Sequence, residues 1–374
     1  MPRRSTSTPP RIRYAVAGLG HIAQVAVLPA FAHAENSELA ALISSDPQKL
    51  EKLGRKYRVK ARAGYDGYEE CLQSERIDAV YITLPNHLHR EYSERASRLG
   101  VHVLCEKPMA VTEEDCRSMI RVAEQHRVKL MVAYRLHFEE ANLRTIDLVQ
   151  SGRLGDPRLF NSVFTMTVKD GDIRLNSREQ GGGTLYDIGI YCINAVRNLF
   201  GAEPMEVMAF SANNGDRRFL RCEEATSAIL RFPGRERLAS FTCSFGAADV
   251  SMYQVVGTEG ELVMNPAYEY AGELKQRIII GGRAREKTFA KRDQFAPELL
   301  HFSECIMKGE TPEPSGQEGL ADVRVIQALY RSADTGQPMT LAPFDKADRA
   351  SLDQEIRRPP VRKPELVNTE APSE

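Results

Sequence analysis

The stretch Ile12–Ala23 reads IRYAVAGLGHIA and determines the fold of the first half of the chain. An apolar run, residues 12–17, leads directly into a G-x-G-x-x-A motif that opens a helix. In such a motif Gly18 permits a tight turn, Gly20 lets the backbone approach a pyrophosphate, and a small third residue keeps helix and strand close. The amides of His21 and Ile22, at the helix start, then face the phosphates. Glycine turns after strands also occur for purely structural reasons, but this position favours dinucleotide binding.

Short apolar runs alternate with helical stretches as far as residue 134. These runs lack polar alternation and are rich in Val, Ile and Leu, which is typical of parallel strands covered on both faces. Helix starts lie between them, at Asp46-Pro47 and at Thr112, which Asp115 follows three residues later. The pattern predicts an α/β fold that begins with a Rossmann-type, doubly wound parallel sheet. The expected strands are Ile12–Ala17, Leu39–Ile43, Ala79–Leu84, Val101–Cys105 and Leu130–Ala133.

The hydrophobic pattern changes to a period of two in the second half. Phe241, Cys243 and Phe245 alternate with serine and threonine, and residues 164–168 repeat the pattern. Strands of this kind have one buried and one polar face, so we expect a C-terminal α/β domain with a mainly antiparallel open sheet. The polar face of that sheet is either solvated or part of a subunit interface. Amphipathic helices are expected near the end, at 295–307 and 318–333.

The chain has 374 residues, which is more than one hydrophobic core usually supports, so two domains are expected. Arg3 and Arg4 could begin an export signal, but Ser, Thr and Pro follow them instead of an apolar segment. The C-terminal residues are dense in charge and proline, which is typical of a solvated tail. We therefore predict a mobile arm at 1–10, a dinucleotide-binding domain at 11–135, a substrate-binding and oligomerisation domain at 136–344, and a charged tail at 345–374.

The amino-acid composition indicates which binding partners and which cellular compartment to expect. The formal net charge of -1 gives no reason to expect nucleic acid or an anionic membrane as partner. No apolar run is long enough to span a bilayer. The seven cysteines form no CxxC pair and look like reduced thiols, which fits a cytoplasmic protein.

The end of the second expected strand distinguishes the two nicotinamide dinucleotides. NAD enzymes usually place an acid there for the ribose hydroxyls, but this strand ends at Ser44, and Asp46 comes two places too late. Ser44 leaves room for a 2′-phosphate, and Lys49, one turn into the helix, could neutralise it. Ser44 could equally be a turn residue and Lys49 a solvated one. The pattern favours NADP.

Lys107, Asp187 and Tyr191 are candidate catalytic residues. Lys107 follows the expected strand Val101–Cys105, at the carboxyl edge where open α/β sheets bind ligands. Asp187 and Tyr191 are four apart after three glycines, so on one helix they would share a face. A phenol with a pKa near 10 needs a nearby cation to serve as acid or base, and Lys107 could supply it. By spacing alone, Lys107 could be a surface residue and Tyr191 a core residue.

Four segments, taken together, resemble the Gfo/Idh/MocA oxidoreductases. The resemblance extends from about Ile12 to Leu341, and four motifs in the right order are far more specific than any one. It implies binding of NADP by residues at the strand edge, a catalytic lysine at Lys107, and a cis peptide bond between Lys107 and Pro108. The segments are Gly18–Ala23, Thr83–His87, Glu106–Pro108 and Gly181–Tyr191.

The resemblance also assigns individual roles. Asp187 would contact the substrate, and Tyr191 would be the acid–base group, as in the glucose–fructose oxidoreductase branch, where most of the family has histidine. Tyr134 would line the substrate together with Lys107, Asp187 and Tyr191. The expected cofactor contacts are Gly18, Gly20, His21, Ile22, Ser44, Lys49, Leu84, Asn86, His89, Glu106, Lys107, Arg135 and Arg174.

The implied activity is hydride transfer between NADP and a sugar or polyol carbon, in a homodimer or homotetramer. Two alternatives stay open. One is a conventional reductase of anhydro-sugars, dihydrodiols or other carbonyls that releases NADP each turnover, and the other is a non-catalytic NADP(H) sensor. We expect no catalytic metal, because the eight histidines contain no HxxxH pair. The N-terminal arm is shorter than in the glucose–fructose oxidoreductase branch, which leaves retention of NADP between half-reactions open.

Overall fold

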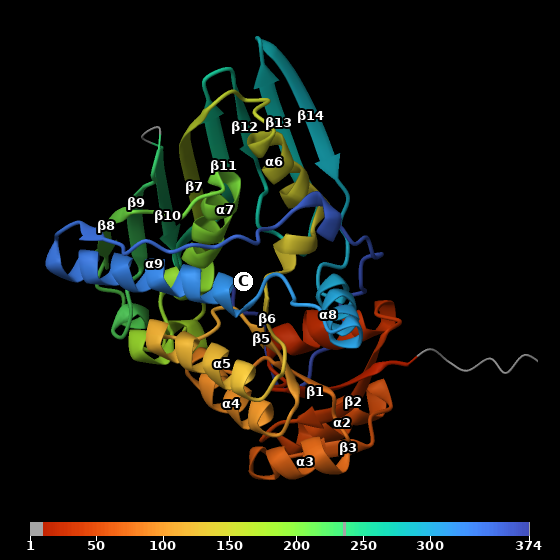
Figure 1. Cartoon of the computed structure of the whole chain (residues 1–374). Helices are drawn as coiled ribbons and strands as arrows, with labels where there is room; N and C mark the ends of the chain where they lie inside the picture. The colour runs from red at the N-terminus through yellow and green to blue at the C-terminus, as the bar shows by residue number, and fades with distance from the viewer. Residues whose placement is uncertain (1–9, 235–236, 374) are drawn as a thin grey trace, which may run out of the picture.

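The computed structural model describes residues 10–234 and 237–373, which form two sheets with helices packed against both (Figure 1). The first sheet is parallel throughout and has the strand order β3-β2-β1-β4-β5-β6. The reversal of strand order between β1 and β4 creates the crevice in which such sheets bind ligands. Its strands are β1 (Ile12–Ala17), β2 (Ser37–Ile43), β3 (Ala61–Ala63), β4 (Ala79–Ile82), β5 (His102–Glu106) and β6 (Leu130–Ala133).

Helices connect and cover the parallel strands. The segment after the glycine motif is π-helical over η1 (Ala23–Val27) and becomes α-helical in α1 (Leu28–Ala30). Asp46 and Thr112 cap their helices through their side chains, as predicted. The remaining helices of this half are α2 (Pro47–Tyr57), α3 (Tyr68–Ser74), α4 (His89–Arg98) and α5 (Glu113–Gln125).

The second sheet has nine strands in the order β14-β13-β12-β11-β7-β10-β9-β8-β15. Every neighbouring pair is antiparallel except β7 with β10, which confirms the predicted mainly antiparallel sheet. Its strands are β7 (Pro157–Thr167), β8 (Glu206–Ala212), β9 (Ala225–Arg231), β10 (Leu238–Ser244), β11 (Gly246–Gly257), β12 (Gly260–Met264), β13 (Leu274–Ile280), β14 (Arg283–Phe289) and β15 (Met339–Thr340).

Helix α9 joins the two halves. It packs on β8 of the second sheet and also on α5 and β6 of the first, and Figure 1 shows it lying between them. The helices of the second half are α6 (Glu140–Gln150), α7 (Ile190–Phe200), α8 (Ala296–Lys308) and α9 (Gly316–Thr335), and the π-helical segment η8 (Leu185–Gly189) precedes α7. The two predicted C-terminal helices correspond to α8 and α9.

The C-terminal residues 345–373 differ from the predicted solvated tail. They run across the molecule as an extended segment and end between the two halves (Figure 1). Lys346 and Ala350 are buried, and the Val367 amide donates to Gln24 Oε1 at 2.8 Å. The prediction of a solvated tail is wrong because the charges of this segment have specific partners on the body of the protein.

The remaining predictions concern the N-terminal arm, the cysteines and membrane spans. The predicted N-terminal arm, residues 1–10, lies outside the described residues except for Pro10. All seven cysteines are buried free thiols. Within 10–234 and 237–373, no helix combines the length and apolar character that a membrane span requires.

Candidate active site

The candidate site is centred on Lys107, which follows β5 at the carboxyl edge of the parallel sheet. The peptide bond between Lys107 and Pro108 is cis, as the resemblance implied. The Lys107 ammonium donates to the backbone carbonyl of Asp187 at 2.8 Å and to its Oδ1 at 3.1 Å. Because Asp187 lies on η8, this contact joins the parallel sheet to the second half of the chain.

Asp187 is held between two cations. Arg174 Nε donates to Asp187 Oδ2 at 2.7 Å, and Arg174 also pairs with Asp172. Burial raises the pKa of the Asp187 carboxyl, but Arg174 and Lys107 outweigh burial and hold it well below its ordinary range. Burial lowers the pKa of Lys107, but Asp187, Tyr191 and Glu106 outweigh it, so the Lys107 pKa lies above its ordinary value. Both groups are therefore ionised at neutral pH.

Tyr191, on α7, lies beside the same lysine. The Lys107 ammonium is 5.0 Å from the centre of the Tyr191 ring. Arg135 Nη2 donates to the Tyr191 hydroxyl at 3.2 Å. The structure thus brings Lys107, Asp187 and Tyr191 together, with the guanidinium of Arg135 on the phenol oxygen. Their catalytic roles stay predictions.

Arg135, predicted as a cofactor contact, lies against Tyr191. Its guanidinium is buried and donates to the side chain of Gln294, to the carbonyl of Tyr268 at 2.6 Å and to Tyr191. These bonds hold the guanidinium against Tyr191, and the predicted contact of Arg135 with the cofactor stays a prediction.

The glycine motif fits a dinucleotide. Gly18 has a φ of +94°, and a Cβ there would lie 2.6 Å from the Thr83 carbonyl oxygen, so only glycine allows this turn. A Cβ at Gly20 would meet no heavy atom within 4 Å, so the backbone there faces open space. His21 and Ile22 follow in the half-buried start of the helix. These features are the ones that the pyrophosphate of NAD or NADP requires.

Ser44 and Lys49, the predicted contacts of the 2′-phosphate, lie directly after β2 and at the start of α2. Ser44 is buried, and its Oγ accepts a hydrogen bond from the Asp46 amide at 3.1 Å. The Asp46 carboxylate accepts from the amides of Gln48 and Lys49, so it caps α2 instead of facing a ribose. Ser44 is therefore partly a turn residue, while half-buried Lys49 is the first cation of α2.

Two of the predicted cofactor residues hold loops together. Both ring nitrogens of His89 lie 2.8 Å from carbonyl oxygens, those of Pro108 and Leu84, and the ring is completely buried. His89 therefore clamps the loops after β4 and β5, and the prediction that it contacts the cofactor is wrong. Asn86 Nδ2 donates to the Gly181 carbonyl at 2.8 Å and so ties the same loop to the triple-glycine segment.

Glu106 lies behind Lys107 in a buried acid cluster. The Tyr81 hydroxyl is 3.1 Å from Glu106 Oε1 and 3.0 Å from Glu298 Oε2. A hydroxyl has one proton, so two ionised carboxylates could not both be satisfied there. Burial raises the pKa of both acids, and the neighbouring Glu106 raises that of Glu298 further, well above its ordinary range. The shared Tyr81 hydroxyl and the higher pKa favour the protonated form of Glu298, whereas the positive charge of Lys107 counters the effect of burial on the pKa of Glu106.

The pocket beside Lys107 contains residues that the sequence did not suggest. Tyr134 lines it, as predicted for a substrate contact, but its hydroxyl is buried beside Asp322. Asn194 lines it too, three residues after Tyr191 on α7, and its spacing could have identified it. Leu136 and Asn142 complete this wall, and nothing in their own spacing marks them. In the described parts of the chain, no group of three or more His, Cys, Asp or Glu side chains is arranged to hold a metal ion.

Both halves of the chain match one family of known proteins. Residues 12–134 match the oxidoreductase family with an NAD-binding Rossmann fold, and residues 143–263 match the Gfo/Idh/MocA C-terminal domain. The chain belongs to the Gfo/Idh/MocA oxidoreductase family. The glycine motif and the Lys107 edge lie within the first match, and Asp187 and Tyr191 lie within the second.

Relatives of this Gfo/Idh/MocA oxidoreductase are similar over nearly their full length. The D-xylose 1-dehydrogenase (NADP(+)) of Haloarcula marismortui is 32% identical over 345 residues, 91% of this chain and 96% of that protein. The aldose–aldose oxidoreductase of Caulobacter crescentus, solved with glycerol, is 38% identical with a TM-score of 0.84, over 88% of this chain and 100% of that one. A 3-ketoreductase of Actinomadura kijaniata, solved with NADP and TDP-benzene, is 27% identical with a TM-score of 0.79, over 86% of this chain and 98% of that one.

Proposed function

We propose that this protein is an NADP-dependent oxidoreductase that moves hydride between the nicotinamide and a carbon of a sugar or polyol. One observation carries the proposal: Lys107 and Arg135 flank Tyr191, next to an ionised Asp187, at the edge of a dinucleotide-binding sheet. The names of the relatives, which include an aldose–aldose oxidoreductase and an NADP(+)-dependent xylose dehydrogenase, support a sugar as substrate.

Tyr191 handles the proton in this proposal. NADP, when bound, accepts or supplies the hydride. In the oxidative direction the phenolate oxygen of Tyr191 takes the proton of the reacting hydroxyl, and in reduction the phenol returns a proton to the carbonyl oxygen. Arg135 donates a hydrogen bond to the Tyr191 hydroxyl and Lys107 lies beside the ring, so both can stabilise negative charge that develops there during proton transfer.

Asp187 positions the substrate. Its carboxylate accepts from Lys107 through Oδ1 and from Arg174 through Oδ2. Each carboxylate oxygen has a second lone pair, so Asp187 can also accept a hydrogen bond from a sugar hydroxyl. The two cations keep the carboxylate ionised and fix its orientation, which holds a neighbouring hydroxyl while Tyr191 reaches the reacting oxygen.

The preference for NADP rests on the end of β2. Ser44 offers no negative charge to repel a 2′-phosphate, and Lys49 supplies a cation one turn into α2. The NADP complex of the similar 3-ketoreductase supports the same preference.

The proposal is tested by turnover on a panel of aldoses. Enzyme loaded with NADP should gain the absorbance of reduced nicotinamide when one aldose is added, and lose it when a second sugar serves as acceptor. Oxidation that proceeds only with a continuous supply of NADP would favour the conventional reductase. Tight NADP binding without turnover on any sugar or carbonyl would contradict the proposal and favour a sensor.

We also propose that the outer face of the nine-stranded sheet pairs with a second copy of the chain. Leu159 and Leu238 are directly opposed on β7 and β10, and both are exposed. Ile229 and Phe210 continue this apolar face on β9 and β8, where Phe210 is 63% exposed. Several large apolar side chains exposed on one sheet face are typical of a protein interface.

Native mass measurement tests the interface. The wild type should be a dimer or a larger even assembly, and Ile229→Lys should shift it towards the monomer. Leu220→Lys is the matched control, because Leu220 is 83% exposed but lies outside the sheet. A monomeric wild type would contradict the proposal.

The seven free thiols support a reducing compartment such as the cytoplasm.

A further inference from the structure

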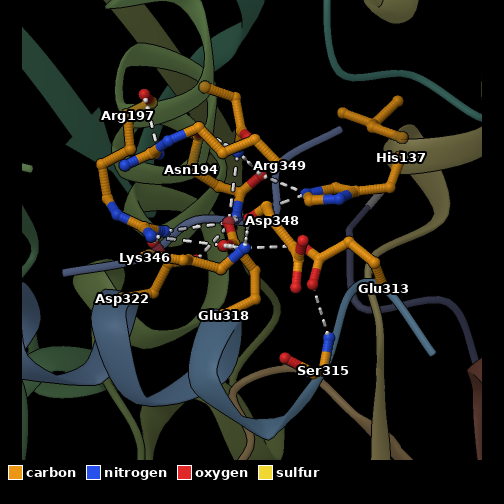
Figure 2. A network of polar contacts seen from close by, with 12 residues as sticks. His137, Asn194, Arg197, Glu313, Ser315, Glu318, Asp322, Lys346, Asp348 and Arg349 are labelled. Atoms are coloured by element: carbon orange, nitrogen blue, oxygen red, sulfur yellow. Dashed lines mark hydrogen bonds and ion pairs between the residues drawn. The ribbon is translucent and has the colours of Figure 1, made fainter. Parts of the chain in front are cut away.

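The C-terminal strap, residues 345–373, is anchored in a buried network of charges. Lys346 pairs with Glu313 at 2.7 Å and with Glu318 at 2.9 Å, and its side chain is 3% exposed. Arg349 pairs with Glu203 at 2.9 Å. Figure 2 shows Lys346 and Arg349 entering the cluster that contains Glu318 and Arg197 of the second half. Since a buried charge without its partner is costly, these pairs hold the start of the strap firmly.

The strap then follows the dinucleotide-binding half. Arg358 donates to the His33 carbonyl at 3.0 Å and pairs with Glu35. Further on, the amide side chain of Gln24 makes two hydrogen bonds with the Val367 backbone, at 2.9 and 2.8 Å.

Gln24 connects the strap directly to the phosphate loop. Its Nε2 also donates to the Leu19 carbonyl at 3.0 Å, within the glycine motif. Gln24 is almost completely buried, so this contact lies beneath the strap and not at its margin. Lys363 lies close enough to His21 of the same loop to contribute, after burial and Arg174, to lowering the pKa of that histidine.

The last residues of the strap cross from one half to the other. Asn368 Nδ2 donates to Asp46 Oδ2 at 3.1 Å, beside the Ser44–Lys49 corner that we assign to the 2′-phosphate. Five residues later Ser373 forms a β-bridge with Val168, and the Lys169 amide donates to the Pro372 carbonyl at 2.9 Å. The segment between these points therefore spans from the start of α2 to the second half of the chain.

We propose that residues 361–373 close over the dinucleotide site and slow the exchange of NADP. The strap is attached on the phosphate loop, at the start of α2 and on the second half, so a nucleotide lying along that edge leaves only after some of these contacts break. The inference rests on the NADP of the proposed function but not on its sugar substrate.

Truncation after Pro360 tests the proposal, because it removes the covering part and keeps the anchors at Lys346, Arg349 and Arg358. The readouts are the rate of NADPH dissociation, followed by nicotinamide fluorescence after mixing with excess NADP, and the fraction of nucleotide that stays bound through gel filtration. We expect dissociation to be at least about ten times faster in the truncated protein, the result of losing roughly 1.4 kcal/mol of barrier.

A point variant guards against misfolding of the truncated chain. Val367→Pro removes the N–H that donates to Gln24 and should also speed dissociation. Glu365→Pro is the matched control: it adds a proline two residues earlier in the strap, where the N–H bonds to no other described residue, and it should leave the rate unchanged.

Two results would overturn the proposal. In one, dissociation is equally slow in wild type, truncated protein and Val367→Pro, so the strap has no hold on the nucleotide. In the other, truncation tightens NADPH binding, so the strap competes for the site. Failure of the proposed function looks different, because sugar turnover would then be absent while NADPH still binds and dissociates at a measurable rate.

Discussion

Lys107→Met removes one of the two positive charges that flank Tyr191. The ammonium lies 5.0 Å from the centre of the tyrosine ring. A unit charge about 5 Å from a negative charge that develops in the transition state stabilises it by roughly 3 kcal/mol at an effective dielectric constant of about 20. If that stabilisation is needed in the transition state, its loss lowers kcat by about two hundredfold. The figure is a lower bound, because Lys107 also orients Asp187 through two hydrogen bonds.

The assay for Lys107→Met separates chemistry from binding. kcat is measured at a saturating aldose concentration, and NADPH affinity is measured separately by fluorescence, since the glycine motif is unchanged in the variant. Lys275→Met is the control, because it removes an exposed lysine from β13 of the second sheet. A kcat within about fivefold of wild type, with nucleotide bound normally, would refute the reasoning.

Three further changes test other parts of the site. Asp187→Asn removes the charge that holds Lys107 and should lower kcat/KM about 10- to 100-fold, the worth of a charged hydrogen bond, whereas an unchanged value would remove Asp187 from the site. Ser44→Asp places an acid at the end of β2 and should shift the ratio of NADP to NAD affinity at least about tenfold towards NAD. Glu298→Gln should stabilise the protein at about pH 8 but not at about pH 5. Burial raises the pKa of the Glu298 carboxyl above its unfolded value, so its stabilising contribution is complete below the unfolded pKa and is lost as pH rises. Parallel melting temperatures of variant and wild type across that range would contradict this account.

The fold could be predicted from the sequence wherever a local pattern determines it. The apolar runs at Ile12–Ala17 and Leu130–Ala133 are the observed strands β1 and β6, because strands covered on both faces need continuous apolar residues. The alternation around Phe241 marked β10 for the same kind of reason. The position of Lys107 followed from the rule that ligands bind at the carboxyl ends of parallel strands.

Contacts between residues far apart in the chain could not be predicted from the sequence. Arg135 lies on a short turn after β6, and only the fold shows that it meets Tyr191, 56 residues later. His89 looked like a ligand-binding histidine, but the fold places carbonyl oxygens at both of its nitrogens. The prediction that the strap is solvated was wrong because it used only the charge and proline content of the segment itself. The carboxylate partners of Lys346 lie on other parts of the chain.

The turnover of Tyr191→Phe tests the central claim most directly. The change removes only the phenol oxygen and keeps the ring that packs against Phe164, so the fold and the nucleotide site should persist. With NADP bound and sugar saturating, kcat should fall by about a hundredfold or more, the usual worth of a positioned acid–base group. A variant that turns over at the wild-type rate would show that the proton moves through another group.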